Sequence, residues 1–178
     1  TAFLTAQGKY LADFFVIRPV GADHLLIDIH HSLAADTLRR LTMYRLRADV
    51  QITATDLAVA RGLGPAPEAG FADPRHPALG WRAYGVAGGP ARIDWDQIRV
   101  AHCIPESGVE LIANDSYLLE CGFERLHGVD FRKGCYVGQE VTARMKHKTE
   151  LKKGLVTLAI EGAAPVGTPI LSGDREAG

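Results

Sequence analysis

The sequence predicts an α+β fold, and three observations support this prediction. The first 56 residues show local patterns in the order strand, strand, helix, strand. A loop rich in proline and glycine then separates further short elements, and near Glu150 the composition changes toward short strands and turns. With 178 residues, 47% of them hydrophobic and 23% charged, the chain can bury a substantial core and resembles ordinary globular proteins in composition.

The N-terminal part is expected to begin with a β-hairpin. Residues 10–17 are rich in β-forming side chains, and residues 24–30 follow a turn signal at 19–23 as a second, mostly buried strand. Ser32 is the expected N-cap of the next helix. The apolar residues of that helix recur at helical spacing, at Leu33, Leu38, Leu41, Tyr44 and Leu46.

The middle of the chain alternates between short elements and loops. Residues 50–56 alternate with period two and predict a half-buried strand. Residues 62–77 carry several prolines and glycines and predict an irregular loop before a short strand at 79–84. Apolar spacing predicts helices over 95–101 and 116–126, of which the first must end before a proline.

The C-terminal part divides near Glu150. A short helix is expected over 139–145, and a strand over 154–160 is followed by turn residues typical of a small all-β module. We therefore expect one α+β domain over residues 1–149 and the beginning of a second, all-β domain over 150–178.

Charge and cysteine content narrow the function classes. The formal net charge is -1 with a pI near 6.6, so the chain lacks the global positive field of a non-specific DNA-binding protein. No apolar run approaches the roughly 20 residues of a membrane span. Cys103, Cys121 and Cys135 are odd in number and form no CxxC pair, which argues against a disulfide framework and for a reducing compartment.

Other ionisable residues give weaker signals. The pairs His30-His31 and His102-Cys103 resemble metal ligands, but neighbours on a strand point to opposite faces and neither pair has a third ligand nearby in the sequence. We therefore expect no local zinc site. Surface or turn positions are the best interpretation of four aspartates: Asp28, Asp49, Asp56 and Asp130.

The segment 132–140, RKGCYVGQE, is the most informative part of the sequence. It places Cys135 between Gly134 and Gly138, with Lys133 two residues before it. A nearby ammonium group and a following helix N-terminus favour a thiolate, which would make Cys135 nucleophilic. On local spacing alone, a small buried hydrophobic residue in a glycine-rich turn is an equally good interpretation of Cys135.

Two further features adjoin this segment. Gln139 and Glu140 could hydrogen-bond the amidine-like edge of a heterocycle such as a pterin, although Glu140 could equally complement the helix dipole. A basic cluster follows and could bind a polyanion, but a solvated face is the default interpretation. Its members are Arg144, Lys146, His147, Lys148, Lys152 and Lys153.

Residues 128–145, with KGCYVGQE at their centre, resemble the signature of the YgfZ family. Further matches lie at residues 7–9, at 73–82 and around Arg99. The resemblance implies folate-binding α+β subdomains around a central cavity, as in the related glycine-cleavage T-protein, followed by a C-terminal β-barrel. It also implies binding of tetrahydrofolate or a one-carbon derivative in support of iron-sulfur cluster assembly or repair, including that of enzymes that modify tRNA.

Residue by residue, the resemblance implies catalytic roles for Cys135 and Lys133, and we expect no metal ligand among the site residues. It implies folate contacts by Gly134, Tyr136, Gly138, Gln139, Glu140, Arg144, Arg82, Arg99 and Glu120. Two departures accompany it: the family's segment before residues 7–9 has no counterpart here, and no proline precedes Glu120 where the family pattern has one.

The resemblance leaves enzymatic activity open. An accessory folate-binding protein is the leading hypothesis, a T-protein-like aminomethyltransferase or one-carbon transferase is the alternative, and a structural module without ligand is the third. The expected partners are iron-sulfur enzymes or cluster-assembly proteins, and the expected state is a monomer. The expected location is the bacterial cytoplasm, or the mitochondrial matrix in a eukaryote.

Overall fold

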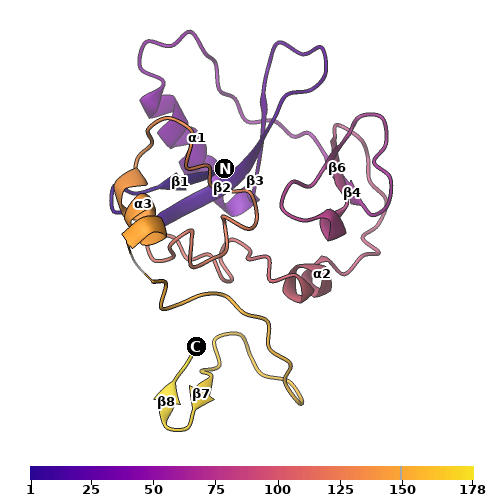
Figure 1. The fold of residues 1–178 in the computed structure, drawn as a ribbon. Coiled ribbons are helices and arrows are strands. Elements are labelled where there is room, and N and C mark those ends of the chain that lie inside the picture. Colours follow the sequence, from indigo (N-terminus) through magenta and orange to yellow (C-terminus); the bar gives the residue numbers. More distant parts are fainter. Residues whose placement is uncertain (149) are drawn as a thin grey trace.

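The computed structural model describes residues 1–148 and 150–178 and shows a mixed arrangement of short strands and helices, consistent with the α+β class (Figure 1). The strands are β1 (Ala2–Leu4), β2 (Tyr10–Ile17), β3 (Leu26–Ile29), β4 (Val59–Gly62), β5 (Gly70–Ala72), β6 (Trp81–Tyr84), β7 (Leu171–Ser172) and β8 (Arg175–Glu176). The helices are α1 (His31–Tyr44), α2 (Trp95–Ala101) and α3 (Gln139–Lys148), with a 3₁₀ turn η1 (Pro77–Leu79).

The first sheet has the order β1-β2-β3 and contains the predicted hairpin. β2 pairs antiparallel with β1 on one side and with β3 on the other, in a register that joins Phe14 to Ile29 and Ile17 to Leu26. Both predicted hairpin strands are therefore confirmed.

Helix α1 forms where the sequence predicts it, but the expected cap is wrong. His30 occupies the N-cap position, and no side chain caps the helix. Ser32 lies inside the first turn, where its hydroxyl lies 2.8 Å from Nδ1 of His30. Because the helix already begins at His31, the backbone N–H groups two and three residues after Ser32 lie within the helix. The Ser32 hydroxyl oxygen therefore cannot accept a capping hydrogen bond from them. Tyr44 and Leu46, expected on the inner face, are exposed.

The second sheet has the order β4-β6-β5, and β6 confirms the strand predicted at 79–84. The strand predicted at 50–56 is wrong, because this segment is extended and largely exposed but pairs with no other described strand. Pairing begins only at Val59, the start of β4. The loop predicted at 62–77 is interrupted by β5, whose Phe71 lies opposite Arg82.

Helices α2 and α3 agree with prediction, whereas the helix predicted at 116–126 is wrong. That segment is a series of hydrogen-bonded turns, because Gly122 adopts a left-handed φ of +74° that a continuous α-helix excludes. Its apolar side chains are nevertheless buried. They complete one core cluster of Leu4, Tyr10, Leu111, Leu118, Cys121 and Phe123, and Leu126 joins a second with Leu79 and Ile104.

The C-terminal segment 150–178 is extended and lies outside these cores (Figure 1). The strand predicted at 154–160 is wrong, since among the described residues no strand pairs with it; β7 and β8 instead form a small hairpin further on. The domain boundary near Glu150 and the C-terminal barrel stay predictions. None of the helices in the described ranges is long and apolar enough to cross a membrane.

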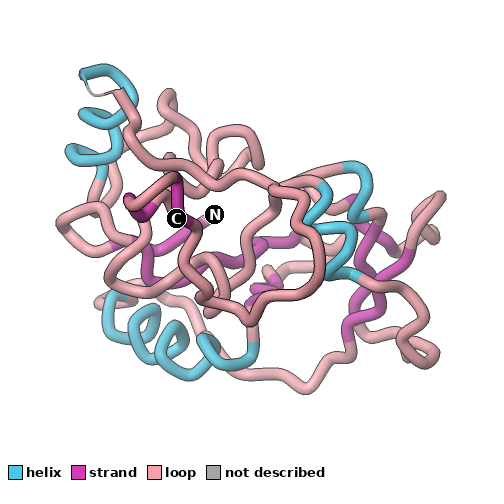
Figure 2. Tube along the Cα trace, turned by 90° about the horizontal axis from the view of Figure 1, so that it is seen from below, coloured by secondary structure: helices cyan, strands magenta, loops and turns pink. Residues whose placement is uncertain are grey.

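The two larger sheets lie beside each other, with α1 and α3 next to the first sheet and away from the second (Figures 1 and 2). Helix α2 lies next to the second sheet in both views and contacts η1. Residues of both sheets line a pocket.

Candidate functional site

A pocket of about 220 Å³ opens between the two larger sheets. Strands β2 and β3 form one wall, β4 and β6 the other, and α2 with the following loop closes one end. The lining residues are Asp13, Phe14, Phe15, Asp28, Ile29, His30, Arg61, Arg75, Leu79, Arg82, Trp95, Arg99, Ile104, Pro105, Glu106 and Ser107.

An ion-pair network joins the two sheets at this pocket. Arg82 of β6 donates from Nη1 to Asp28 of β3 at 2.8 Å and from Nε to Asp73 at 3.3 Å. Asp73 also accepts from Arg75 at 2.8 and 3.0 Å, and Asp28 accepts from the Tyr84 hydroxyl at 2.9 Å. The surface position expected for Asp28 is therefore wrong, because only 14% of its side chain is exposed and it holds Arg82 across the sheets.

The same network sets the ionisation of the Asp73 carboxylate and the Tyr84 phenol. Burial disfavours the charged form of Asp73, but hydrogen bonds and positive charge from Arg75, with the charge of Arg82, outweigh it and lower the pKa of Asp73. Burial and the nearby Asp28 raise the pKa of Tyr84 far above its usual range. Tyr84 therefore stays protonated and donates to Asp28.

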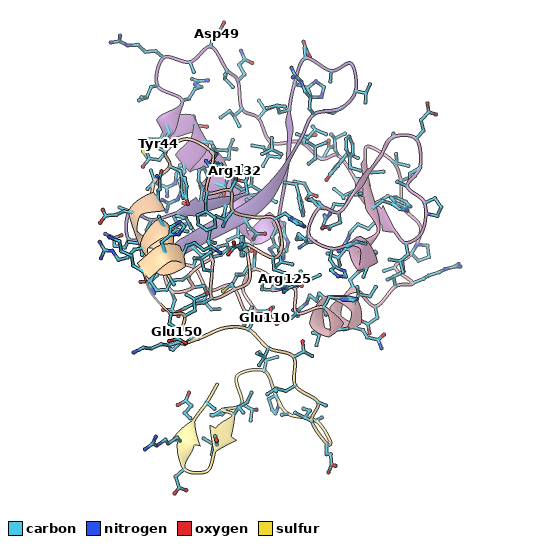
Figure 3. All side chains as sticks on the ribbon, in the orientation of Figure 1. Tyr44, Asp49, Glu110, Arg125, Arg132 and Glu150 are labelled. Atoms are coloured by element: carbon cyan, nitrogen blue, oxygen red, sulfur yellow. The ribbon has the colours of Figure 1, made fainter. Side chains whose placement is uncertain are left out.

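Arg99 of α2 is anchored by three carboxylates. Its guanidinium lies 2.7 Å from Asp96, 3.0 Å from Glu106 and 2.9 Å from Glu110. Burial lowers the pKa of Arg99, but the hydrogen bonds to Glu110 and Asp96 outweigh it and raise the pKa above its usual value. Figure 3 shows Glu110 on the lower side of the body, well away from Tyr44 and Asp49 at the end of α1.

Arg61 and Trp95 complete the pocket wall, and sequence reasoning missed both as site residues. The guanidinium carbon of Arg61 lies 3.9 Å from the centroid of the Trp95 ring. Burial, then the charges of Arg82 and Arg75, lower the pKa of Arg61 to about 10, so it remains a cation at neutral pH. Arg61 is separated in sequence from the motifs, so only its cross-strand position opposite Arg82 reveals it.

The two glycines of the motif differ: Gly138 is closely packed, whereas Gly134 has open space around it. Gly138 has a φ of +84°, and a Cβ added there would lie 2.7 Å from the Thr5 carbonyl oxygen and 3.0 Å from Cα of Gly8. A Cβ at Gly8 would in turn meet Val141 at 2.9 Å. The two glycines therefore let the start of α3 pack against the turn between β1 and β2, whereas Gly134 has open space around it.

The side chains around the motif cysteine are engaged with one another. Gln139 accepts from the backbone N–H of Tyr136 through Oε1 at 3.1 Å, and the Lys133 ammonium lies 4.6 Å from the centre of the Tyr136 ring. Glu140 and Arg144 form an exposed pair at 2.7 Å, one turn apart on α3. Glu120 is half-buried, and its carbonyl accepts from Leu155 at 3.1 Å.

The basic cluster lies mainly on exposed surface. Lys146 pairs with Glu124 at 2.6 Å, and 61% of the Arg144 side chain is exposed. The default interpretation, a solvated face, fits these exposures.

The three cysteines differ in exposure. Cys135 is exposed, Cys103 is half-buried and Cys121 is buried. The interpretation of Cys135 as a small buried hydrophobic residue is therefore wrong. Burial raises the pKa of Cys121, so a smaller fraction of this thiol is in the reactive thiolate form than for a cysteine with an ordinary pKa.

The structure thus separates the predicted site residues into two groups. Arg82 and Arg99 line the pocket, whereas the residues of the motif segment, together with Glu120, lie outside its lining. In Figure 3, Arg132, directly before Lys133, lies toward α1 and away from Glu110, the partner of Arg99. The individual roles of all these residues stay predictions.

The candidate histidine pairs have contacts that the sequence did not predict. His31 begins α1 and so does not share a strand with His30, and their rings lie 4.6 Å apart. The His102 ring stacks on His76 at 4.1 Å. Within the ranges that the structure describes, no group of three or more His, Cys, Asp or Glu side chains is placed to hold a metal ion.

Comparison with known proteins gives a consistent result. The chain is 31% identical, over 94% of its length, to "Iron-sulfur cluster assembly factor IBA57 homolog, mitochondrial" of Mycosarcoma maydis. The IBA57 factors of Mus musculus and Homo sapiens are each 29% identical to it, over 92% and 86% of the chain. The chain is a homologue of the IBA57 factors.

The match to IBA57 covers only part of each relative. The chain spans 46% of the Mycosarcoma maydis protein, 54% of the mouse protein and 51% of the human protein, so it corresponds to about half of their length. No family model matches the chain. In the Mycosarcoma maydis comparison, the aligned region nevertheless includes nearly all of this chain, and with it the residues that line the pocket.

Proposed function

We propose that the protein containing this chain is a member of the YgfZ/IBA57 group and acts in iron-sulfur cluster assembly. The observation that carries this proposal is the similarity to IBA57 factors of fungi and mammals over 86 to 94% of the chain. The KGCYVGQE segment, on which the resemblance to the YgfZ family rests, supports the same assignment.

We further propose that the region between the two sheets contributes to a tetrahydrofolate site. Arg82 and Arg99, two of the residues implied by the resemblance, line the pocket there and are held in place by carboxylates. Ligand pockets for drug-sized molecules enclose roughly 300–1,000 Å³. A pocket of about 220 Å³ would hold one end of a folate and leave the remainder to other surfaces.

The exposure of Cys135 supports an accessory role for the thiol. Because Cys135 lies at the surface and outside the pocket lining, a cluster-carrying protein can approach it directly. We propose that iron-sulfur enzymes, among them those that modify tRNA, depend on this protein for their clusters. Since the matched relatives are named as mitochondrial, we propose the mitochondrial matrix for a eukaryotic protein and the cytoplasm for a bacterial one.

Depletion of the full-length protein in its own cells tests the role in cluster assembly. We expect the activities of iron-sulfur enzymes to fall while enzymes without clusters keep theirs. Equal loss in both classes, or loss in neither, would contradict the proposal.

Calorimetry on the full-length protein tests the ligand. Tetrahydrofolate should bind, and Arg82→Gln should weaken binding more than Arg47→Gln, which removes the same charge from an exposed loop. Absence of binding would favour a module that keeps the fold without the ligand. Release of ammonia from an aminomethyl-lipoyl carrier would favour the transferase alternative.

A further inference from the structure

Arg61 occupies an unusual position between the two sheets. Arg61 in β4 lies directly opposite Arg82 in β6, and cross-strand neighbours of like charge repel each other. Arg82 is compensated by Asp28 and Asp73, with N–O distances of 2.8 and 3.3 Å. Arg75 is compensated by Asp73 at 2.8 Å. The repulsion is therefore relieved on one strand and not on the other.

Arg61 itself has no ionic partner. Across residues 1–148 and 150–178, no carboxylate lies within 4.0 Å of its guanidinium. The other arginines of the pocket, Arg75, Arg82 and Arg99, each have such a partner. Its Nε is buried and has no hydrogen-bond partner among the described residues. A buried donor without an acceptor costs free energy, and most buried donors in native proteins have an acceptor.

Trp95 covers one face of the Arg61 guanidinium plane, with the ring centroid 3.9 Å from the central carbon. Stacking occupies the face and not the in-plane N–H groups, which match the two oxygens of a carboxylate or phosphate. Burial, then the charges of Arg82 and Arg75, lower the pKa of Arg61 to about 10, because they outweigh the more distant charges of Asp73 and Asp28.

We propose that Arg61, stacked on Trp95, forms an oxyanion subsite in the pocket between the sheets. The ligand group is a carboxylate or a phosphate, because Arg61 lines the pocket and the guanidinium fork matches planar or tetrahedral oxyanions. Binding of the anion supplies the charge that Asp28 and Asp73 supply to Arg82. This inference goes beyond the proposed function, since it identifies a ligand chemistry from the pocket alone.

Two probes distinguish the source of the oxyanion. Inorganic phosphate represents a phosphate ligand, and glutarate represents the carboxylate end of a larger molecule. Each is titrated into the full-length protein while the Trp95 indole N–H signal is followed by NMR, with Trp95→Phe to assign it. A saturable shift with one probe alone supports the subsite and names its source, and shifts with both probes support a subsite that accepts either oxyanion.

Variants of Arg61 decide the outcome. Arg61→Gln should fold with equal or higher thermal stability without anion, because it removes an uncompensated charge, and should lose at least about tenfold in affinity, as expected for a charge-assisted hydrogen bond. Arg61→Lys keeps the charge without the fork and should bind several-fold more weakly than wild type. Arg47→Gln, which removes a charge from the exposed loop after α1, should bind like wild type.

Three results would overturn the proposal. The first is the absence of a saturable shift with both probes in the wild-type protein. The second is binding by Arg61→Gln as tight as that of Arg47→Gln. The third is a Trp95 signal that stays unchanged while another site titrates. None of these results depends on tetrahydrofolate, so they leave the proposed function untouched.

Discussion

At the scale of single residues, the buried carboxylate of Asp73 shows how pairing overcomes burial. None of its side chain is exposed, yet hydrogen bonds from Arg75 and Arg82 keep it ionised. Its pKa lies below its ordinary 3.8, so the pairing stabilises the fold at every pH well above 3.8. That contribution is lost as the pH falls below 3.8 and through the lower pKa of the folded state.

Asp73→Asn should therefore destabilise the protein in a pH-dependent way. At pH 7 we expect a loss of about 2–3 kcal/mol in the free energy of unfolding, because two arginines lose a charged acceptor. The difference from wild type should shrink as the pH is lowered below 4. Urea unfolding between pH 3 and 7 measures it, with Asp49→Asn as an exposed control. A difference that grows on acidification would contradict the assignment.

The cysteines allow a second prediction at the same scale. Cys135 is exposed, whereas Cys121 is buried and has a raised pKa. Iodoacetamide should therefore modify Cys135 first, Cys103 next and Cys121 last in the native protein. Mass spectrometry of quenched samples gives the three rates. If Cys121 reacted as fast as Cys135, the exposures would be wrong.

At the scale of elements, the contact between α3 and the β1–β2 turn depends on Gly138. Gly138→Ala places a Cβ 2.7 Å from the Thr5 carbonyl oxygen at a φ of +84°. We expect a loss of roughly 2 kcal/mol or more in the free energy of unfolding. Gly134→Ala, in the same motif but with open space around it, should change stability by less than about 0.5 kcal/mol. Equal unfolding midpoints in urea for the two variants would refute the packing role.

The sequence predicted those elements whose periodicity coincides with real packing. Residues 10–17 and 95–101 were predicted with the bounds of β2 and α2, because their side-chain patterns match surfaces that pack. Residues 50–56 and 154–160 carry strand-like patterns but find no partner strand in the described chain. Strand formation depends on that non-local partner, which a local pattern does not contain.

The helix predicted at 116–126 is wrong for a different reason. Leu118, Cys121 and Leu126 are buried as helical spacing predicts, but Gly122 and His127 adopt positive φ, at +74° and +58°. Burial periodicity alone does not distinguish a helix from successive turns that bury the same side chains.

At the scale of the whole molecule, the candidate site joins residues that are distant in sequence. Arg82 and Asp28 are 54 residues apart, and Arg61 acquires its meaning only from its place opposite Arg82. The motif at 128–145 carries the resemblance to the YgfZ family, but its cysteine lies outside the pocket lining. Sequence reasoning therefore anticipated relatives named as iron-sulfur cluster assembly factors better than it predicted the geometry of the site.

The extended segment 150–178 gives a prediction at this scale. Lys152 and Lys153 are exposed, and in this segment the contacts to the body include hydrogen bonds from Leu155 and Thr157. Trypsin should therefore cleave the native chain at Lys152 or Lys153 well before Lys9, whose ammonium is hydrogen-bonded to the Asp115 carbonyl. Timed digestion with mass spectrometry gives the order of cleavage. First cleavage at Lys9 would contradict the arrangement.

The proposed role in cluster assembly uses the exposed thiol of Cys135. The most direct measurement is the activity of iron-sulfur enzymes, relative to enzymes without clusters, in depleted cells that re-express the full-length protein. Wild type and Cys103→Ala should restore these activities, whereas Cys135→Ala should accumulate as folded protein and fail to restore them. Full restoration by Cys135→Ala, or no deficit in the depleted cells, would contradict the account.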